Sequence, residues 1–357
     1  MPMIDDRSAI SVSDLWKQCL RSVFLLTGNQ TERERELDRE VAFYYSNAFS
    51  DNTKRTYTTH RNSYIKFCEH FGYAAVPASS NTICRYAAFL AKSLKFNSVK
   101  QYLNIIRLLH AEWNLPNPLS NDFRLTTMLQ GIRRHLGDNV VRKRPITPAM
   151  LLAIKSALDF TNSLDSTVWA VALTMFYGLL RKSNVLPSLA KAFHPDKQLR
   201  LCDITYHNWG IRLHVRWSKT NQFQSKSLDI PLPRLQHHRL CPVQAIFHAA
   251  RQTAGADPFG PAFLCVIGGN AKPLTSEQFI VRIRQCLEAA GIPSSNIASH
   301  SFRRGGATFG YSIGLSPDAI KLLGDWRSNC YQQYISDDFR QRFRTIQLMQ
   351  RAIKDSL

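Results

Sequence analysis

The hydrophobic pattern of this 357-residue chain changes period twice, and that restricts the folds it can adopt. From about residue 52 the apolar residues recur at helical spacing, as in NTKRTYTTHRNSYIKFCEHFG, which ends at Gly72. Between residues 201 and 233 they alternate instead, in LCDITYH, GIRLHVRWSKT and SKSLDIPLP. Helical spacing then resumes and continues to the end. This order predicts a mainly α protein with a small antiparallel β-sheet (α+β), not a βαβ array.

The helical segments before the alternating region divide into two groups, as expected for a chain long enough for about two domains. Four helical patterns between residues 46 and 136 predict a compact helical domain. The stretch GDNVVRKRPITP has no apolar period, so residues 137–146 are expected to be a basic linker. Thr147 and Pro148 form a strong helix start and open a second domain, 147–357. Residues 1–45 are an N-terminal extension without assignable chemistry.

The net charge of +20 and the isoelectric point near 9.9 indicate a polyanionic partner. The positive charge is spread over the whole chain rather than gathered in a tail, which favours a protein that wraps nucleic acid. The basic linker either crosses the phosphate backbone or is a solvated tether. The candidate DNA-binding residues are Lys100, Arg107, Arg133 and Arg134 of the helical domain and Arg142, Lys143 and Arg144 of the linker.

Several protein classes are disfavoured. No apolar run approaches the roughly 20 residues that a membrane span needs. The N-terminus is acidic and then polar, unlike a signal peptide. The eight cysteines stand singly, with no CxxC pair, which argues against a zinc ribbon or a disulfide framework. We therefore expect a soluble intracellular protein, in the nucleus if the source is eukaryotic and otherwise in the cytoplasm.

Six separated residues have the side chains that DNA strand transfer requires. A phosphodiester repels nucleophiles, so its site must supply fixed positive charge and hydrogen-bond donors. Arginine matches two phosphate oxygens and stays charged. A proton donor for the leaving 5′-oxygen and a nucleophile held in line complete the requirement. The candidates are Arg181 at the end of an apolar helix, Lys219 at a hairpin turn, His300 and Arg303 on one helical face, Trp326, and Tyr334.

The order of these residues resembles the catalytic set of the tyrosine recombinases, the phage-integrase family. The segments GLLRKSNVLP, SKTNQF, HSFRRGGAT and GDWRSNCYQQYI are especially similar to Crypton-like recombinases of eukaryotic mobile elements. The resemblance covers most of the chain from about Asn52. It implies that the helical residues form the family's core-binding (SAM-like) domain and that residues 147–357 form its catalytic domain.

The resemblance also implies roles. Arg181 and Arg303 hold the scissile phosphate, and Lys219 is the general acid toward the 5′-oxygen. Tyr334 attacks and forms a 3′-phosphotyrosyl bond. Because that bond conserves the energy of the phosphodiester, no metal or cofactor is expected. Tyr331 is the rival nucleophile, since family tyrosines usually follow the Trp326 position by nine residues, whereas Tyr334 follows it by eight and Tyr331 by five.

Four further positions bear on the resemblance. His300 contacts the phosphate and assists the tyrosine proton, and Trp326, where many members have histidine, donates one hydrogen bond from its indole. Asn184 stands where an acidic residue is common. Arg304, next to Arg303, is expected to face DNA backbone or solvent.

The resemblance favours a site-specific recombinase that integrates or excises a mobile element. A type IB topoisomerase is disfavoured because the few residues between Trp326 and Tyr334 leave no room for its long helical linker. A non-enzymatic DNA-binding protein derived from a recombinase is a further alternative. The apolar spacing after Tyr334 either folds back on its own core or, as in the family, exchanges a C-terminal helix within a homo-tetramer.

Overall fold

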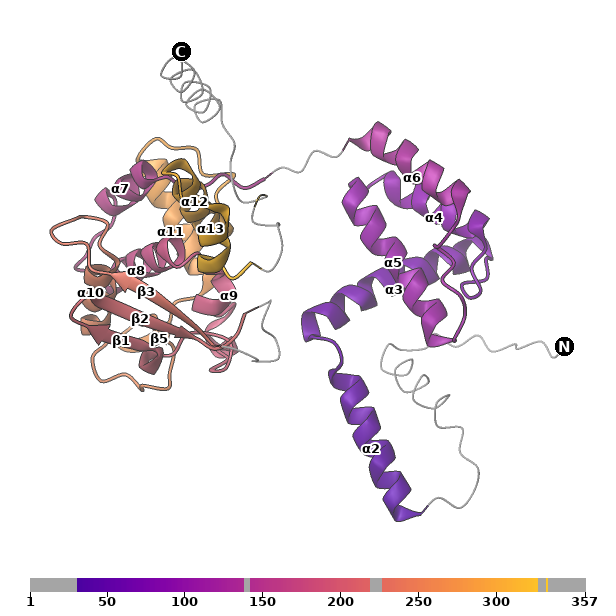
Figure 1. Ribbon diagram of the computed structural model, residues 1–357, viewed down its shortest axis with the longest axis horizontal. Helices are drawn as coiled ribbons and strands as arrows, with labels where there is room; N and C mark the ends of the chain where they lie inside the picture. Colours follow the sequence, from indigo (N-terminus) through magenta and orange to yellow (C-terminus); the bar gives the residue numbers. More distant parts are fainter. Residues whose placement is uncertain (1–30, 138–141, 219–226, 327–331, 333–357) are drawn as a thin grey trace, which may run out of the picture. The chain divides into compact units, whose positions relative to one another are not determined.

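The computed structural model describes residues 31–137, 142–218, 227–326 and 332. The chain divides into two compact units, Met1–Val140 and Val141–Leu357, and each has its own hydrophobic core (Figure 1). The division falls inside the stretch predicted to be a linker. The mainly helical fold with small antiparallel sheets confirms the predicted fold class.

The first unit is helical throughout its described part. Its helices are α2 (Glu32–Asn47), α3 (Asp51–Phe71), α4 (Ser80–Ala91), α5 (Phe96–Glu112) and α6 (Phe123–Leu136). Helices α3 to α6 enclose a core in which Tyr64, Tyr86 and Ile106 are fully buried, whereas no residue of α2 is buried. Helix α3 ends, as predicted, at Gly72, which adopts the left-handed conformation (φ 66°) that glycine tolerates best.

The sequence segment NTICRYAAFLAKSL suggests Asn81 as the N-cap of its helix, but the N-cap of α4 is Ser79. The hydroxyl of Ser79 accepts from the backbone N–H of Thr82, and the helix begins at Ser80. Ser79 is extended (ψ 153°), as an N-cap must be, whereas Asn81 already lies in the first helical turn.

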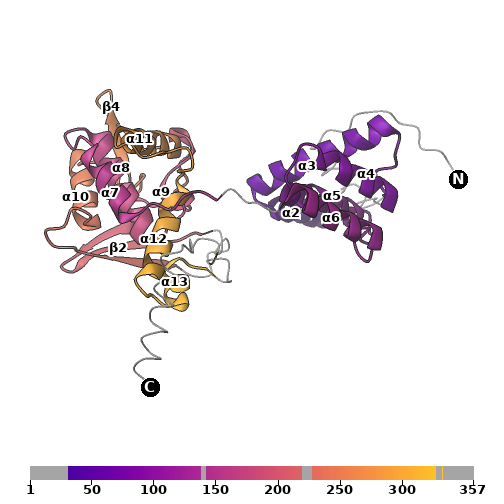
Figure 2. The ribbon, with the colours of Figure 1, turned by 90° about the horizontal axis from the view of Figure 1, so that it is seen from above.

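The second unit surrounds one buried helix. Its helices are α7 (Pro148–Ser156), α8 (Ser163–Tyr177), α9 (Lys182–Val185), α10 (Pro242–Gln252), α11 (Ser276–Ala289), α12 (His300–Ser312) and α13 (Pro317–Leu323). Every residue of α8 from Asp165 to Phe176 is buried, and both α10 and α12 pack against it (Figure 2). The predicted cap of α7 is confirmed, because the Thr147 hydroxyl accepts from the N–H of Met150.

The predicted sheet is confirmed as an antiparallel one of order β1-β2-β3: β1 (Ile204–His207), β2 (Gly210–Val215) and β3 (Leu228–Pro233). In its register Leu213 pairs with Ile204 on one side and with Ile230 on the other. The sequence analysis missed a second hairpin, β4 (Leu264–Ile267) with β5 (Asn270–Pro273). Its turn is Gly268-Gly269, both with positive φ, and a Gly-Gly pair between two short apolar runs is a hairpin signal.

Candidate active site

Helix α12 begins at His300 and lies close to α8 and to the segment that leads into α7. A Cβ on Gly306 would collide with the carbonyl oxygen of Phe176 and the side chain of Leu179, and one on Gly305 with the carbonyl oxygen of Ile146. The backbone of Ile146 also donates to the carbonyl of Ser301 (3.0 Å). The two glycines of SFRRGG therefore set how closely α12 approaches its neighbours.

The side chain of Arg303 is buried, with 2% of its surface exposed. Its Nη1 donates to the carbonyl of Leu179, and its Nη2 donates to the carbonyl of Gly324 (2.7 Å). These two carbonyls come from the turn after α8 and the turn after α13. Arg303 therefore joins three segments that are far apart in the sequence.

Trp326 lies against this arginine. The guanidinium carbon of Arg303 is 4.0 Å from the centroid of the Trp326 ring, within the range of a cation–π contact. The indole is buried in a small apolar cluster with Leu179, Ala307 and Ile320. A Cβ on Gly324 would overlap the indole, so glycine is required there.

Two non-glycine residues at this cluster adopt the left-handed backbone conformation: Leu179 within it (φ 46°) and Asp325 next to Trp326 (φ 50°). Such conformations are costly and persist where surrounding contacts hold them, which happens most often at functional sites. Each is held by a contact of the cluster, Leu179 through its carbonyl to Arg303 and Asp325 through its carboxylate to Ser218.

His300 stands at the exposed start of α12, among cations. Desolvation, followed by the charges of Arg303, Arg181, Arg304 and Lys182, lowers its pKa to about 4. The imidazole is therefore neutral at pH 7 and has one donor and one acceptor nitrogen.

Arg181 was expected from the sequence to end the apolar helix, and this expectation is wrong. Helix α8 stops at Tyr177, and the left-handed conformation of Leu179 turns the chain. Arg181 is then the extended residue before α9, and its side chain is half-buried. Its charge lowers the pKa of His300, as the charge of Arg303 also does.

The end of the β2 segment is fixed to the site by two side chains. The amide of Asn184 donates to the carbonyl of Trp217 (2.6 Å), and the Ser218 hydroxyl donates to the Asp325 carboxylate (2.8 Å). Sequence reasoning missed Ser218 and Asp325; their position next to Lys219 and Trp326 was the available signal. Asn184, where the family commonly has an acid, anchors the strand end that precedes Lys219.

Three candidate residues lie outside the part of the chain that the structure describes: Lys219, Tyr331 and Tyr334. Arg304 differs from its expectation. Only 8% of its surface is exposed, so it does not face solvent. The charge of Arg304 instead acts on His300.

The remaining basic candidates are exposed. In the first unit Lys100 and Arg133 lie over the ring of Phe96, at 5.7 and 5.9 Å from its centroid, so α5 and α6 present adjacent cations. Arg107 and Arg134 are exposed on the same two helices. In the second unit Arg142, Lys143 and Arg144 are exposed, and the N–H of Arg144 donates to the carbonyl of Asn296 (2.9 Å). The end of the predicted linker is thus bound to the second unit.

Within the described ranges, no three His, Cys, Asp or Glu side chains come together as a metal site. Four of the six cysteines described there, Cys68, Cys241, Cys265 and Cys286, are buried thiols. No described helix is both long and apolar enough to span a bilayer.

His300 and the cations that lower its pKa, Arg303, Arg181, Arg304 and Lys182, are called the cluster around His300 below. This cluster offers cationic and neutral hydrogen-bond donors to a small anion.

Comparison with known proteins gives one curated relative and several solved structures. No family model matches the sequence. The relative is an "Integrase/recombinase xerD homolog" of Selenomonas ruminantium, 22% identical over 311 residues, which are 86% of this chain and 85% of the relative.

Two solved structures share the fold. The post-cleavage complex of the XerH site-specific recombinase with palindromic difH has a TM-score of 0.57 at 12% identity, with 90% of each chain covered. A lambda integrase fragment, a dimer bound to a COC' core site, has a TM-score of 0.54 at 17% identity, covering 85% of this chain and 95% of that one. These similarities confirm the predicted architecture.

Proposed function

We propose that this chain is a site-specific DNA recombinase of the tyrosine recombinase and integrase family, which cleaves and rejoins DNA through a 3′-phosphotyrosyl intermediate. The observation that carries the proposal is the buried Arg303, which is held by the Leu179 and Gly324 carbonyls against the Trp326 ring. The charges of Arg303 and Arg181 both lower the pKa of His300, in agreement with it. The similarity to the xerD homologue over most of both chains supports it independently.

The charges around His300 suit a phosphodiester. A phosphodiester carries one negative charge, which increases as the pentavalent transition state forms, and fixed cations stabilise that increase more than they stabilise the substrate. Arg303 is held by two carbonyls and an indole, so it costs little to reorganise when the substrate binds. We assign Arg181 and Arg303 to the two nonbridging oxygens.

His300 contributes in its neutral form. With its pKa lowered to about 4, the imidazole hydrogen-bonds the phosphate through one nitrogen and accepts the proton of the attacking phenol through the other. Bound phosphate compensates the surrounding cations and raises that pKa again, which makes the ring a better base when the substrate is present.

The covalent step is assigned to residues beyond the described ranges. We propose that the Tyr334 oxygen attacks phosphorus, that the bond to the 5′-oxygen breaks, and that Lys219 protonates the leaving oxygen. Reversal with a new 5′-hydroxyl rejoins the strand. The anchoring of Trp217 and Ser218, directly before Lys219 in the chain, supports this assignment.

The finer expectations from sequence become part of the proposal. Residues 46–136 are the core-binding domain and 147–357 the catalytic domain, which together hold double-stranded DNA. Four copies assemble on DNA by exchange of the C-terminal segment. The segments that resemble Crypton-like recombinases favour integration or excision of a mobile element, and hence a nuclear location in a eukaryotic source.

The test is covalent trapping. The substrates are duplexes with a random core sequence and a nick in each strand. Cleavage next to a nick releases a short oligonucleotide that carries the 5′-hydroxyl. Without that hydroxyl the strand cannot be rejoined, so the attacking tyrosine stays attached to the DNA. We expect the protein to retain labelled DNA after denaturing washes, without metal. Peptide mass mapping is expected to find the adduct on Tyr334.

Two variants make the result decisive. The duplex recovered from the trapped adduct serves as the substrate for both variants. Tyr334→Phe is expected to bind this duplex as the wild type does and to form no adduct. Tyr331→Phe is expected to form the adduct normally. An adduct on Tyr331 refutes the assignment of the nucleophile. Tight DNA binding without an adduct on any recovered duplex refutes the enzymatic proposal.

A further inference from the structure

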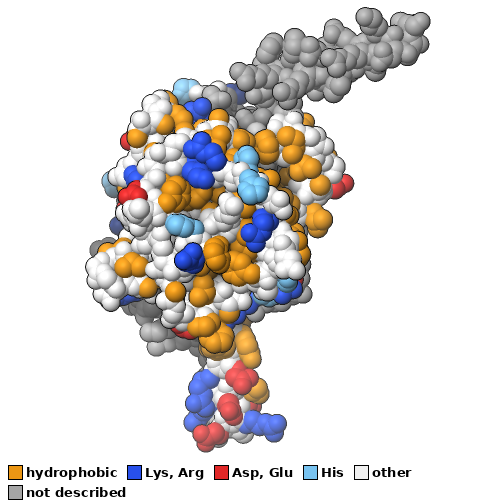
Figure 3. Space-filling view, turned by 90° about the vertical axis from the view of Figure 1, so that its left-hand side faces the viewer, with side chains coloured by type: hydrophobic (Ala, Val, Ile, Leu, Met, Phe, Trp, Pro, Cys, Tyr) orange, Lys and Arg blue, Asp and Glu red, His pale blue; other side chains and the backbone are white. Residues whose placement is uncertain are grey.

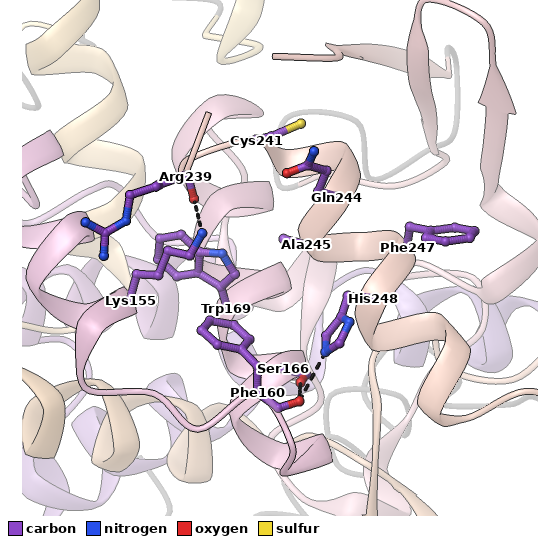
Figure 4. Close-up of a pocket in the computed structure, with 10 residues that line it drawn as sticks. All are labelled: Lys155, Phe160, Ser166, Trp169, Arg239, Cys241, Gln244, Ala245, Phe247 and His248. Atoms are coloured by element: carbon purple, nitrogen blue, oxygen red, sulfur yellow. Dashed lines mark hydrogen bonds between the residues drawn. The ribbon is translucent and has the colours of Figure 1, made fainter. Parts of the chain in front are cut away.

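An open cavity of about 330 Å³ lies in the second unit, between α7, α8 and α10 (Figure 4). Trp169, Ala245 and Cys241 are buried beneath it, and Phe160 and Phe247 form aromatic walls. None of the residues that line it belongs to the cluster around His300. Its volume is within the range of protein ligand sites, about 300–1,000 Å³.

The charged side chains that line this cavity, those of Lys155 and Arg239, are basic. Figure 4 shows Lys155 and Arg239 on one side and His248 on the other, and none of the described residues that line the cavity is acidic. The Lys155 ammonium donates to the carbonyl of Arg239 (2.9 Å), and Nη2 of Arg239 donates to the hydroxyl of Ser156 (3.0 Å). Each cation is thus held in place with donor capacity left over.

His248 is oriented in the same way. Its Nε2 donates to the carbonyl of Phe160 (3.1 Å), so Nδ1 of the neutral ring is left as an acceptor for a donor group of a ligand. Desolvation and the charge of Arg239 lower the pKa of Lys155, so an anion placed between these groups relieves an existing repulsion.

The apolar surface continues beyond the cavity. The rings of Phe247 and Tyr206 meet edge to face at 6.2 Å, and the guanidinium of Arg251 lies 6.0 Å from the Phe247 centroid. Phe247 is 53% exposed, and Tyr206 is also exposed. Figure 3 shows the side of the unit on which α10 lies, where orange patches alternate with blue and pale blue side chains and few red ones.

We propose that this cavity and the adjoining face of α10 bind an acidic segment of a partner protein, whose large apolar side chain enters the cavity while its carboxylates meet Lys155 and Arg239. Exposed aromatic rings beside arginine are typical of protein interfaces. The aromatic floor favours a peptide over DNA, because a phosphate backbone has no apolar group to insert. The extension to Tyr206 favours a peptide over a small metabolite, because it lengthens the surface past the cavity.

The test uses a fluorescein-labelled peptide, Gly-Asp-Glu-Asp-Trp-Leu-Glu-Asp-Glu, with the full-length protein and fluorescence anisotropy. A second peptide has alanine at the tryptophan and leucine, so its charge is unchanged. We expect the first to bind at least tenfold more tightly. Equal affinity means attraction by the net charge of +20 alone and overturns the proposal.

The protein variants separate this site from general charge. Arg239→Glu and Lys272→Glu change the net charge equally, but Lys272 is an exposed residue of β5 outside the cavity lining. We expect at least a tenfold loss for Arg239→Glu, little change for Lys272→Glu, and a loss of about threefold or more for Phe247→Ala. Equal losses for the two charge reversals contradict the proposal.

Thermal unfolding shows whether each variant is folded. All three residues are exposed, so we expect the variants to fold. If Arg239→Glu nevertheless destabilises the unit, the peptide affinity of Phe247→Ala still tests the proposal. Covalent trapping on DNA is expected to be unchanged in all three variants, so failure here is distinguishable from failure of the proposed recombinase activity. If duplex DNA displaces the peptide and Arg239→Glu weakens DNA binding equally, the surface is a DNA contact and the proposal is wrong.

Discussion

The guanidinium of Arg303 lies 4.0 Å from the centre of the Trp326 ring while it donates to two backbone carbonyls. The carbonyls of Leu179 and Gly324 use part of the donor fork, and the indole covers one face. One arginine therefore has a structural and a proposed catalytic duty. For any substitution of Arg303, the stability of the protein and its activity must therefore be measured separately.

Arg303→Lys is expected to lower the rate of adduct formation by at least about 100-fold, the scale of losing one preorganised transition-state donor. Lysine keeps the charge but cannot donate to both carbonyls and a phosphate at once. Single-turnover trapping on the selected duplex measures the rate, and anisotropy measures DNA affinity, which we expect to change little. A variant that traps DNA at the normal rate contradicts the assigned role.

Trp326→Phe is the matched partner of that experiment, because it keeps an aromatic face over Arg303 and removes the indole N–H. If the N–H contacts the phosphate, adduct formation slows while the thermal midpoint changes by a few degrees at most. A large loss of stability with a normal rate per folded molecule shows instead that the indole serves packing alone.

Asn184→Ala is expected to destabilise the protein by about 1 kcal/mol, the cost of leaving the part-buried Trp217 carbonyl without its donor. Asn184→Asp restores the acid common in the family but places a carboxylate against that carbonyl, so we expect it to form adduct more slowly than the wild type. Asn270→Ala, at an exposed position on β5, is the control. Faster trapping by Asn184→Asp shows that the strand end is not held in this way.

Gly306→Ala is expected to destabilise the second unit by about 1–3 kcal/mol through overpacking, since its Cβ meets the Phe176 carbonyl and Leu179. Alanine is otherwise the better helix residue by about 1 kcal/mol. Gly131→Ala supplies the control, because Gly131 lies within α6 with open space around it. We expect that variant to be slightly stabilised in denaturant titration. Opposite signs for the two substitutions are the result to look for.

The depressed pKa of His300 gives a pH effect of known sign. Between about pH 6.5 and pH 4 the unfolded chain binds a proton at this position that the folded chain does not, so stability falls as the pH falls through this window. His300→Gln removes this contribution. We expect the drop in thermal midpoint from pH 7.5 to pH 5 to be smaller in the variant. An identical drop in both proteins shows that His300 is not in a cationic environment.

Lys100 and Arg133 flank Phe96, and we expect them to contact phosphate. The double variant Lys100→Gln with Arg133→Gln is expected to reduce the slope of log affinity against log salt by about 2, because each lost phosphate contact changes it by about 0.9. Lys54→Gln, on α3 beside Asp51, is the control. An unchanged slope places the DNA elsewhere.

Much of the local structure followed from sequence because it depends on near neighbours. The left-handed Gly72, the Thr147 cap and the alternation of β1 to β3 are set by short-range sterics and hydrogen bonds. The second hairpin had a comparable signal in Gly268-Gly269, which was overlooked. The predicted N-cap of α4 was wrong by two residues. Ser79 and Asn81 are both good N-cap residues, and the choice between them depends on where the chain leaves the preceding loop.

The fold class and the residue types of the candidate site could be predicted before any coordinates, because periodicity and side-chain chemistry are properties of the chain. Three features depend on how distant segments pack together: Arg303 donates to both Leu179 and Gly324, Arg304 is buried, and Ser218 reaches Asp325. These contacts join residues separated by 21 to 124 positions. No local preference specifies them, since they exist only when α12 packs against the turns that follow α8 and α13.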